Sequence, residues 1–115
     1  TGFSLLVDLD NVVVSAANVG HDANAYVDAL PGELIGEIHL GGHEADAAEP
    51  GLLIDSHARP VPPDVWHLLR RLVERIGPRP TLVEWDTDVP AWPVLHLEVQ
   101  KAEFCLQAHA KDRWR

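Results

Sequence analysis

Carboxylate and imidazole side chains stand where apolar segments of this sequence end. Asp8 closes the apolar run Phe3–Val7, and Asn11 follows three residues later. His39 lies near the end of a second apolar run, and His43 follows it after two glycines. Oxygen and imidazole donors without thiolates suit iron, manganese or zinc in a catalytic role. The pattern therefore predicts a catalytic metal site.

Two other segments add donors of the same kinds. Glu84 lies within the apolar segment Thr81–Trp85, and Asp86 follows that segment. The long connection before it contains Asp55 and His57. A carboxylate in a buried strand is costly unless it is paired or binds a metal. Glu84 is therefore the donor that is hardest to explain as a purely structural residue.

Most of these candidates also have a structural interpretation when they are taken alone. Asp8 is suited to capping a turn, and Asn11 is a common turn residue. His39 fits a hydrogen-bonded core histidine, and Asp55 with His57 fits an Asx-turn that carries a surface imidazole. These interpretations stay open for the single residues, and the metal-site hypothesis depends on the set.

The elements that must position these residues can be predicted from hydrophobic periodicity. Short, partly β-branched apolar runs predict buried strands at Phe3–Val7, Leu34–Leu40 and Thr81–Trp85. Helices are expected at 24–30, at 64–76 and from 90 to about 109, with a loop from Asp10 to Asp22 and a long connection from 43 to 63. The helix at 64–76 is the clearest, because its apolar residues recur at the helical period: Val65, Leu68, Leu69, Leu72, Val73 and Ile76.

Strands that alternate with helices predict an α/β fold with parallel strands and right-handed crossovers. Functional residues of such folds collect at the carboxyl ends of the strands, so we expect the donors to meet at one edge of the sheet. Three βα units are too few to close a (β/α)8 barrel. The open strand edges predict self-association or cover from another part of a protein.

The composition argues against several classes of partner. The 115 residues carry a formal net charge of −9, so neither nucleic acid nor an anionic membrane surface is an expected partner. No apolar run approaches the roughly 20 residues of a membrane-spanning helix, and the N-terminus lacks a signal-peptide pattern. Cys105 is the only cysteine, which excludes an internal disulfide and a multi-cysteine zinc site. We therefore expect a cytoplasmic protein.

Four motifs, in this order along the chain, resemble those of a known family. They are LVDLDNV at 6–12, EIHLGGH at 37–43, LIDSH at 53–57 and PTLVEWD at 80–86. From Leu5 to Leu106 the sequence resembles the multinuclear non-heme iron-dependent oxidases, a family of xylose-isomerase-like TIM barrels. The combination of these motifs in this order is specific to that family.

This resemblance implies a (β/α)8 barrel that holds two or three iron ions at its mouth and uses O2 as co-substrate. Characterised relatives modify cysteine residues of ribosomally synthesised precursor peptides, and many work with a partner protein that recruits the peptide leader. The resemblance also implies a set of site residues, with Asp86 as a supporting neighbour of the metal ligands Asp8, Asn11, His39, His43, Asp55, His57 and Glu84.

The sequence is less than half as long as a full member of that family. It is expected to be the C-terminal segment of a single TIM-barrel domain, with about three βα units over residues 1–115. The resemblance implies further His and Glu ligands in the N-terminal part, so we expect an incomplete multi-iron site in this chain alone. Two alternatives stay open: a divalent-metal isomerase or phosphodiesterase of the xylose-isomerase-like superfamily, and a non-catalytic partial barrel that serves assembly.

Overall fold

The computed structural model describes residues 4–113, so Phe3 of the first predicted strand lies outside the described residues. In chain order the elements are β1 (Leu5–Asp8), α1 (Leu9–Val19), α2 (Ala23–Asp28), a 3-10 turn (Gly32–Leu34), β2 (Ile35–Leu40), β3 (Glu44–Ala45), β4 (Leu53–Ile54), α3 (Pro63–Ile76), β5 (Thr81–Val83) and α4 (Trp92–Arg113).

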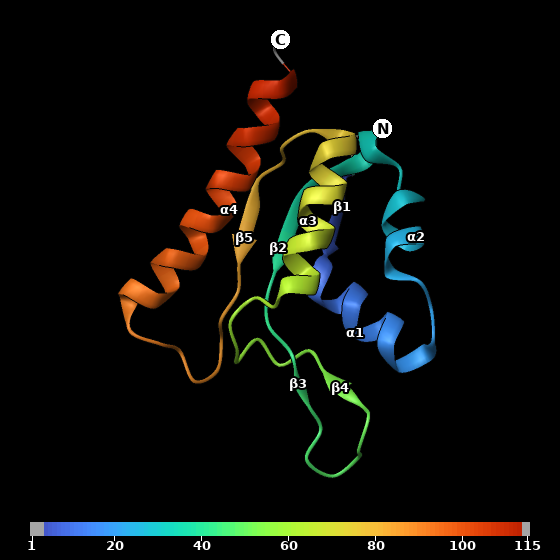
Figure 1. Ribbon diagram of the computed structural model, residues 1–115, viewed down its shortest axis with the longest axis vertical. Coiled ribbons are helices and arrows are strands. Elements are labelled where there is room, and N and C mark those ends of the chain that lie inside the picture. Colours follow the sequence, from blue (N-terminus) through green and yellow to red (C-terminus); the bar gives the residue numbers. More distant parts are fainter. Residues whose placement is uncertain (1–3, 114–115) are drawn as a thin grey trace.

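Three parallel strands form the main sheet, in the order β1-β2-β5 (Figure 1). Asp8 of β1 lies opposite His39 of β2, and His39 lies opposite Leu82 of β5. The predicted α/β fold with parallel strands is confirmed. Each crossover between neighbouring strands contains helix, so the open sheet is consistent with one arc of a (β/α)8 barrel.

The apolar side of α3 covers one face of this sheet (Figure 1). Val65, Leu69 and Leu72 of α3 are fully buried, and so are Ile38 and Leu40 of β2. Every apolar residue that the helical period singled out between 64 and 76 is buried, which confirms that prediction. Burial of this face removes several large aliphatic side chains from water and is the main hydrophobic contribution to the fold.

The opposite face of the sheet is open. Side chains at alternate positions of a strand point to opposite faces. The face away from α3 carries Leu6 and Leu82, which are 54% and 50% exposed. Asp8 and His39 have the same strand parity and lie on this face. The predicted donors of the strands therefore occupy the side of the sheet that α3 leaves uncovered.

The segment after Asp8 contradicts the prediction of a loop, because it forms the helix α1. Asp8 caps this helix, since its Oδ1 accepts a hydrogen bond from the backbone N–H of Asn11 at 3.1 Å. Successive valines have weak helix propensity. Val13 and Val14 are nevertheless buried on the inner side of α1, so tertiary packing outweighs their local preference.

The long connection before α3 and the end of β5 also differ from the sequence prediction. The connection contains the antiparallel hairpin β3–β4, which extends away from the main sheet (Figure 1). Strand β5 ends at Val83, so Glu84 follows the strand rather than lying within it. The N–H of Glu84 still donates to the carbonyl oxygen of Leu40 at 2.7 Å, which fixes Glu84 against the carboxyl end of β2.

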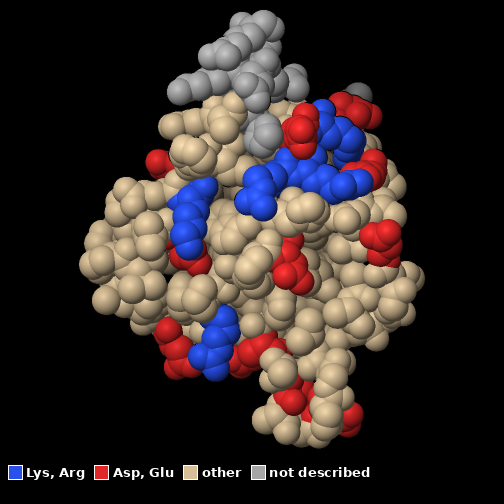
Figure 2. Space-filling view, viewed as in Figure 1, with Lys and Arg blue, Asp and Glu red and all other residues tan. Residues whose placement is uncertain are grey.

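Arginine side chains of α3 bind groups of α2 and of the segment that follows it. Basic side chains gather over α3 on the face seen in Figure 2. The guanidinium of Arg71 binds the carboxylate of Asp28, with an Nη2–Oδ2 distance of 2.6 Å. Arg75 donates to the carbonyl oxygens of Val27 and Leu30. These contacts give partners to a carbonyl group in the last turn of α2 and to one in the segment after it, and they hold α2 beside α3.

The helix α4 ends later than predicted and carries a buried acid. Ala102 and Cys105 are buried on its inner side, as expected for small apolar residues. Glu98 is also buried, and its Oε1 accepts a hydrogen bond from the N–H of Val61 at 2.8 Å. Across the described part of the chain, no helix combines the length and the apolar character needed to cross a membrane.

Truncating a side chain of α3 tests the assignment of the core. We expect Leu69→Ala to lower the free energy of unfolding by about 2–5 kcal/mol, because it leaves a cavity under the helix. Leu97→Ala is the matched control, since Leu97 on α4 is 52% exposed, and it should change stability by less than about 0.5 kcal/mol. Urea unfolding followed by circular dichroism measures both, and equal losses would contradict the assigned core.

Candidate metal centre

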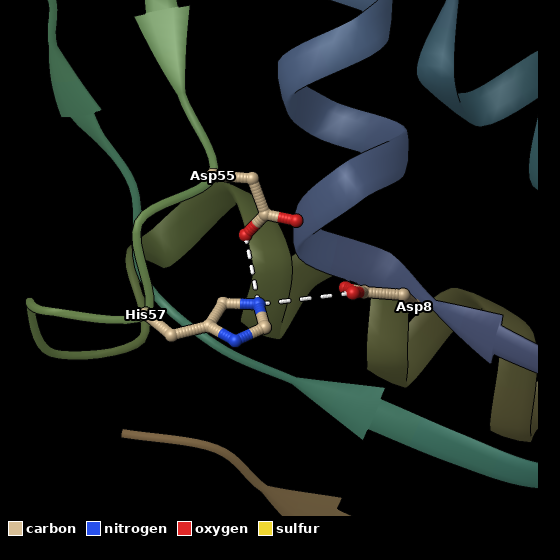
Figure 3. Close-up of side chains that lie close together, drawn as sticks. All are labelled: Asp8, Asp55 and His57. Atoms are coloured by element: carbon tan, nitrogen blue, oxygen red, sulfur yellow. Dashed lines mark ion pairs between the residues drawn. The ribbon is translucent and has the colours of Figure 1, made fainter. Parts of the chain in front are cut away.

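Carboxylates and imidazoles converge at the carboxyl ends of the three parallel strands. Asp8 ends β1, and His39 lies one residue before the end of β2. Glu84 directly follows β5, and Asp55 directly follows β4. His57 comes from the loop between β4 and α3 and reaches toward the same place (Figure 3).

Asp8, Asp55 and His57 form the first donor group (Figure 3). Their ligating atoms all lie within 4.8 Å of one another. The Nε2 atom of His57 is 2.9 Å from Oδ1 of Asp55 and 3.8 Å from Oδ2 of Asp8. The three side chains are half-buried, so they remain within reach of a cation.

His57, Glu84 and Asp86 form the second donor group, with ligating atoms again within 4.8 Å of one another. The Nδ1 atom of His57 is 3.5 Å from Oε2 of Glu84 and 3.2 Å from Oδ2 of Asp86. Asp86 is 66% exposed and forms the outer side of the site. His57 thus joins both groups, one through each ring nitrogen.

The backbone of His57 is fixed from two sides. Its φ of 53° lies in the left-handed region. Its N–H donates to the carbonyl oxygen of Gly42 at 3.0 Å, and its own carbonyl oxygen accepts from the N–H of Asp86 at 2.8 Å. A Cβ on Gly42 would lie 2.2 Å from the carbonyl oxygen of Arg59, and one on Gly41 would lie 2.8 Å from Cδ2 of His57. The two glycines therefore allow the loop of His57 to pack on β2.

His39 lies between two carboxylates. Its Nε2 is 2.6 Å from Oε2 of Glu37, and its Nδ1 contacts Oε1 of Glu84. Burial acts to lower the pKa of His39, but its hydrogen bonds to the two carboxylates outweigh burial and raise the pKa above its ordinary value. Burial likewise opposes protonation of His57, yet Asp86, Asp55, Glu84 and Asp8 raise its pKa.

Asp10, in the first turn of α1, is fully buried and belongs to neither donor group. Its Oδ1 is 2.7 Å from Nδ1 of His43. Burial raises the pKa of Asp10 to about 9, and a hydrogen bond with Asp55 and the charges of Asp55 and Asp8 add to the effect. Burial also raises the pKa of Asp8, although the N–H of Asn11 acts in the opposite direction. The apo site thus resists holding all its carboxyl groups ionised at once.

The structure brings five of the eight predicted site residues into the two donor groups: Asp8, Asp55, His57, Glu84 and Asp86. His39 joins them through its contact with Glu84. His43 contacts Asp10 instead, and Asn11 is exposed and donates its backbone N–H to Asp8. The ligand roles of all these residues stay predictions.

Sequence reasoning missed Asp10 and Glu37. The sequence pattern predicts a loop at Asp10, whereas in α1 this residue falls on the buried side with Leu9 and Val13, a spacing that indicates burial once the helix is recognised. Glu37 stands two residues before His39 in a strand, so strand alternation could have placed both side chains on one face.

The donor set fits a bound metal ion. Oδ1 of Asp55 and Nε2 of His57 are buried and form an ion pair at 2.9 Å, but neither makes a hydrogen bond of good geometry. Buried polar groups in native proteins are nearly always hydrogen-bonded, so these two atoms are suited to a further partner. A cation coordinated by both atoms would be such a partner, and mixed carboxylate and imidazole donors suit iron, manganese or zinc.

The sequence matches a family model and several curated relatives. The family is described as RiPP precursor modification enzyme MbnB/TglH/ChrH, and its model matches residues 1–107. A UPF0276 protein of Caulobacter sp. (strain K31) is 53% identical over 113 residues, which are 98% of this chain and 41% of that protein. A UPF0276 protein of Paraburkholderia phytofirmans is 55% identical over 104 residues, or 89% of this chain and 34% of that protein. The chain thus spans about two-fifths or less of the length of these curated relatives.

Replacing Asp10 by asparagine tests the buried carboxyl group. Folded Asp10 keeps its proton up to a pH of about 9, whereas the unfolded chain releases it near 3.8. The folded state binds more protons between these values, so its stability falls as pH rises through the window. Asp10→Asn cannot titrate and can donate to Asp55. We expect it to be more stable than wild type at about pH 8, by about 1–3 kcal/mol.

Urea unfolding of metal-free protein at about pH 5 and about pH 8 provides the measurement, and the advantage of Asp10→Asn should shrink at the lower pH. Asp88→Asn is the matched control, because Asp88 is exposed and has a left-handed φ of 51° that asparagine tolerates. The same stability difference at both pH values would contradict a buried proton on Asp10.

Proposed function

This chain belongs to the MbnB/TglH/ChrH family of RiPP precursor modification enzymes, and from that membership we propose that it forms the C-terminal, metal-binding part of an iron-dependent oxidase. The proposed reaction uses O2 to modify cysteine residues of a ribosomally synthesised precursor peptide. The proposed partners are that peptide and a protein that recruits its leader, and the proposed location is the cytoplasm.

The observation that carries this proposal is the sharing of His57 by two donor groups. Asp8 and Asp55 face Nε2 of this imidazole, and Glu84 and Asp86 face Nδ1. The carboxylates on both sides of this ring offer places for more than one cation, of which the neutral imidazole itself can bind one, and they balance the positive charge of such ions. A structural role alone would not require four acids around one imidazole.

Iron bound here would supply redox chemistry with O2 and would lower the pKa of a coordinated substrate thiol. In this proposal Asp8, Asp55 and Glu84 provide the anionic ligands. His39 and His57 provide neutral nitrogen ligands, which requires them to release the protons that the apo site favours. Metal affinity should therefore rise with pH through the range in which these imidazoles deprotonate.

Metal content tests the proposed site. After anaerobic incubation with Fe(II) and removal of unbound metal, we expect elemental analysis to find about one equivalent of iron or more per wild-type chain. Glu84→Ala should lose most of this iron, because Glu84 contacts His39 and belongs to the donor group around His57. Glu103→Ala is the matched control, since Glu103 is exposed on α4, and it should retain the iron.

A second measurement separates the site from the reaction. A full-length family member that carries these residues as its C-terminal part is loaded with iron and mixed with a cysteine-containing peptide in air-saturated buffer, and O2 uptake and peptide mass are followed. Peptide-dependent O2 uptake that Glu84→Ala abolishes is the expected result. Peptide-dependent O2 uptake that survives Glu84→Ala would contradict the proposed reaction at this site, whereas iron retained by Glu84→Ala in the isolated chain would contradict the ligand assignment.

A further inference from the structure

Glu37 stands beside the candidate metal centre but belongs to neither donor group. It lies two residues before His39 on β2, so both side chains extend from the open face of the sheet. Oε2 of Glu37 is 2.6 Å from Nε2 of His39, a short distance typical of a charge-assisted hydrogen bond. The other ring nitrogen of His39, Nδ1, contacts Glu84.

The two ring nitrogens of His39 therefore face different surroundings. Nδ1 is directed to Glu84, which shares the second donor group with His57. Nε2 is directed to Glu37, whose side chain is 49% exposed. A histidine can bind a metal only through a nitrogen that carries no proton, and the hydrogen bond of the other nitrogen decides which one that is.

We propose that Glu37 is a positioning residue that accepts the Nε2–H of His39 and thereby leaves Nδ1 free to bind a metal ion together with Glu84. The inference rests on the proposed metal site. A carboxylate behind a ligating imidazole fixes the orientation of the ring and increases its basicity. Glu37 fills this place through His39, without any contact of its own with the ion.

The position of Glu37 argues against a purely structural role. Glu37 itself is 49% exposed, so solvent screens its ion pair with His39 and the pair contributes only modestly to stability. Its partner His39 is only 15% exposed and is already held by Glu84 on the other side of the ring. The Glu37 contact therefore adds little to the fold, but it places an acceptor at Nε2 of His39, on the side of the ring away from Glu84.

Co(II) titration of the apo chain, followed by visible absorption, provides the test. We expect Glu37→Ala to weaken Co(II) binding by about 10–100-fold, as is typical when an outer carboxylate of a metal site is removed. Glu37→Gln keeps an oxygen that can accept the Nε2–H, so it should recover most of the affinity. Glu103→Ala, at an exposed acid on α4, is the control for net charge.

Nitrogen NMR of the Zn(II)-loaded chain labelled with 15N-histidine gives a readout that a structural role would not move. Wild type should show His39 with a metal-bound Nδ1 and a protonated Nε2, and Glu37→Ala should lose this single tautomer. Circular dichroism should be unchanged in both variants, because Glu37 is half-exposed. A wild-type spectrum with the metal on Nε2 would overturn the proposal.

The outcomes distinguish the two levels of inference. Absence of Co(II) binding by wild type would overturn the metal site itself, and the role of Glu37 with it. Co(II) binding that is the same in wild type and Glu37→Ala would overturn only the role of Glu37. Equal losses in Glu37→Ala and Glu37→Gln would identify Glu37 as a direct ligand and would also overturn the positioning role.

Discussion

Crowding of acidic groups is the constraint on which this site depends. Asp8, Asp10 and Asp55 approach one another at the end of β1, in a chain whose formal net charge is already −9. Like charges at such distances cannot all remain ionised without compensation. The apo chain compensates by keeping the buried Asp10 protonated and by raising the pKa values of His39 and His57. A divalent cation would provide the same compensation more directly, since it replaces protons with positive charge at the centre of the donors.

The apolar core and the candidate site lie on opposite faces of the sheet. The apolar side of α3 packs on one face of the sheet and contains the fully buried Leu69 and Leu72. The other face holds Asp8, His39 and the exposed Leu6 and Leu82. Side chains of the site can therefore be polar and charged without disturbing the core. The donors lie at the carboxyl edge of the strands, which is the edge where (β/α)8 barrels carry their sites.

Family membership bears on the class of substrate, and the distances between side chains bear on the role of each residue in the site. The family modifies RiPP precursors, which makes a peptide the natural class of substrate to propose. Within the chain, His57 lies between two donor groups, and His39 is held between Glu37 and Glu84. These two imidazoles connect acids at the ends of β1, β4 and β5 in one network. The matched segment covers 41% and 34% of the length of the two relatives.

The sequence by itself determined the parallel α/β fold, the helix α3 and which segments carry the donors, because apolar periodicity and strand-end polarity are local properties. It did not determine α1, because the valines of that segment favour strands locally and only burial of Val13 and Val14 makes the helix favourable. Once α1 is recognised, helical spacing places Asp10 on the buried side, and strand alternation places Glu37 on the face of His39, but neither pattern reveals the contacts that these acids make. Those contacts depend on distances between side chains, some from different elements and some from one face of a strand. Only the tertiary structure determines which nitrogen of each imidazole faces which carboxylate.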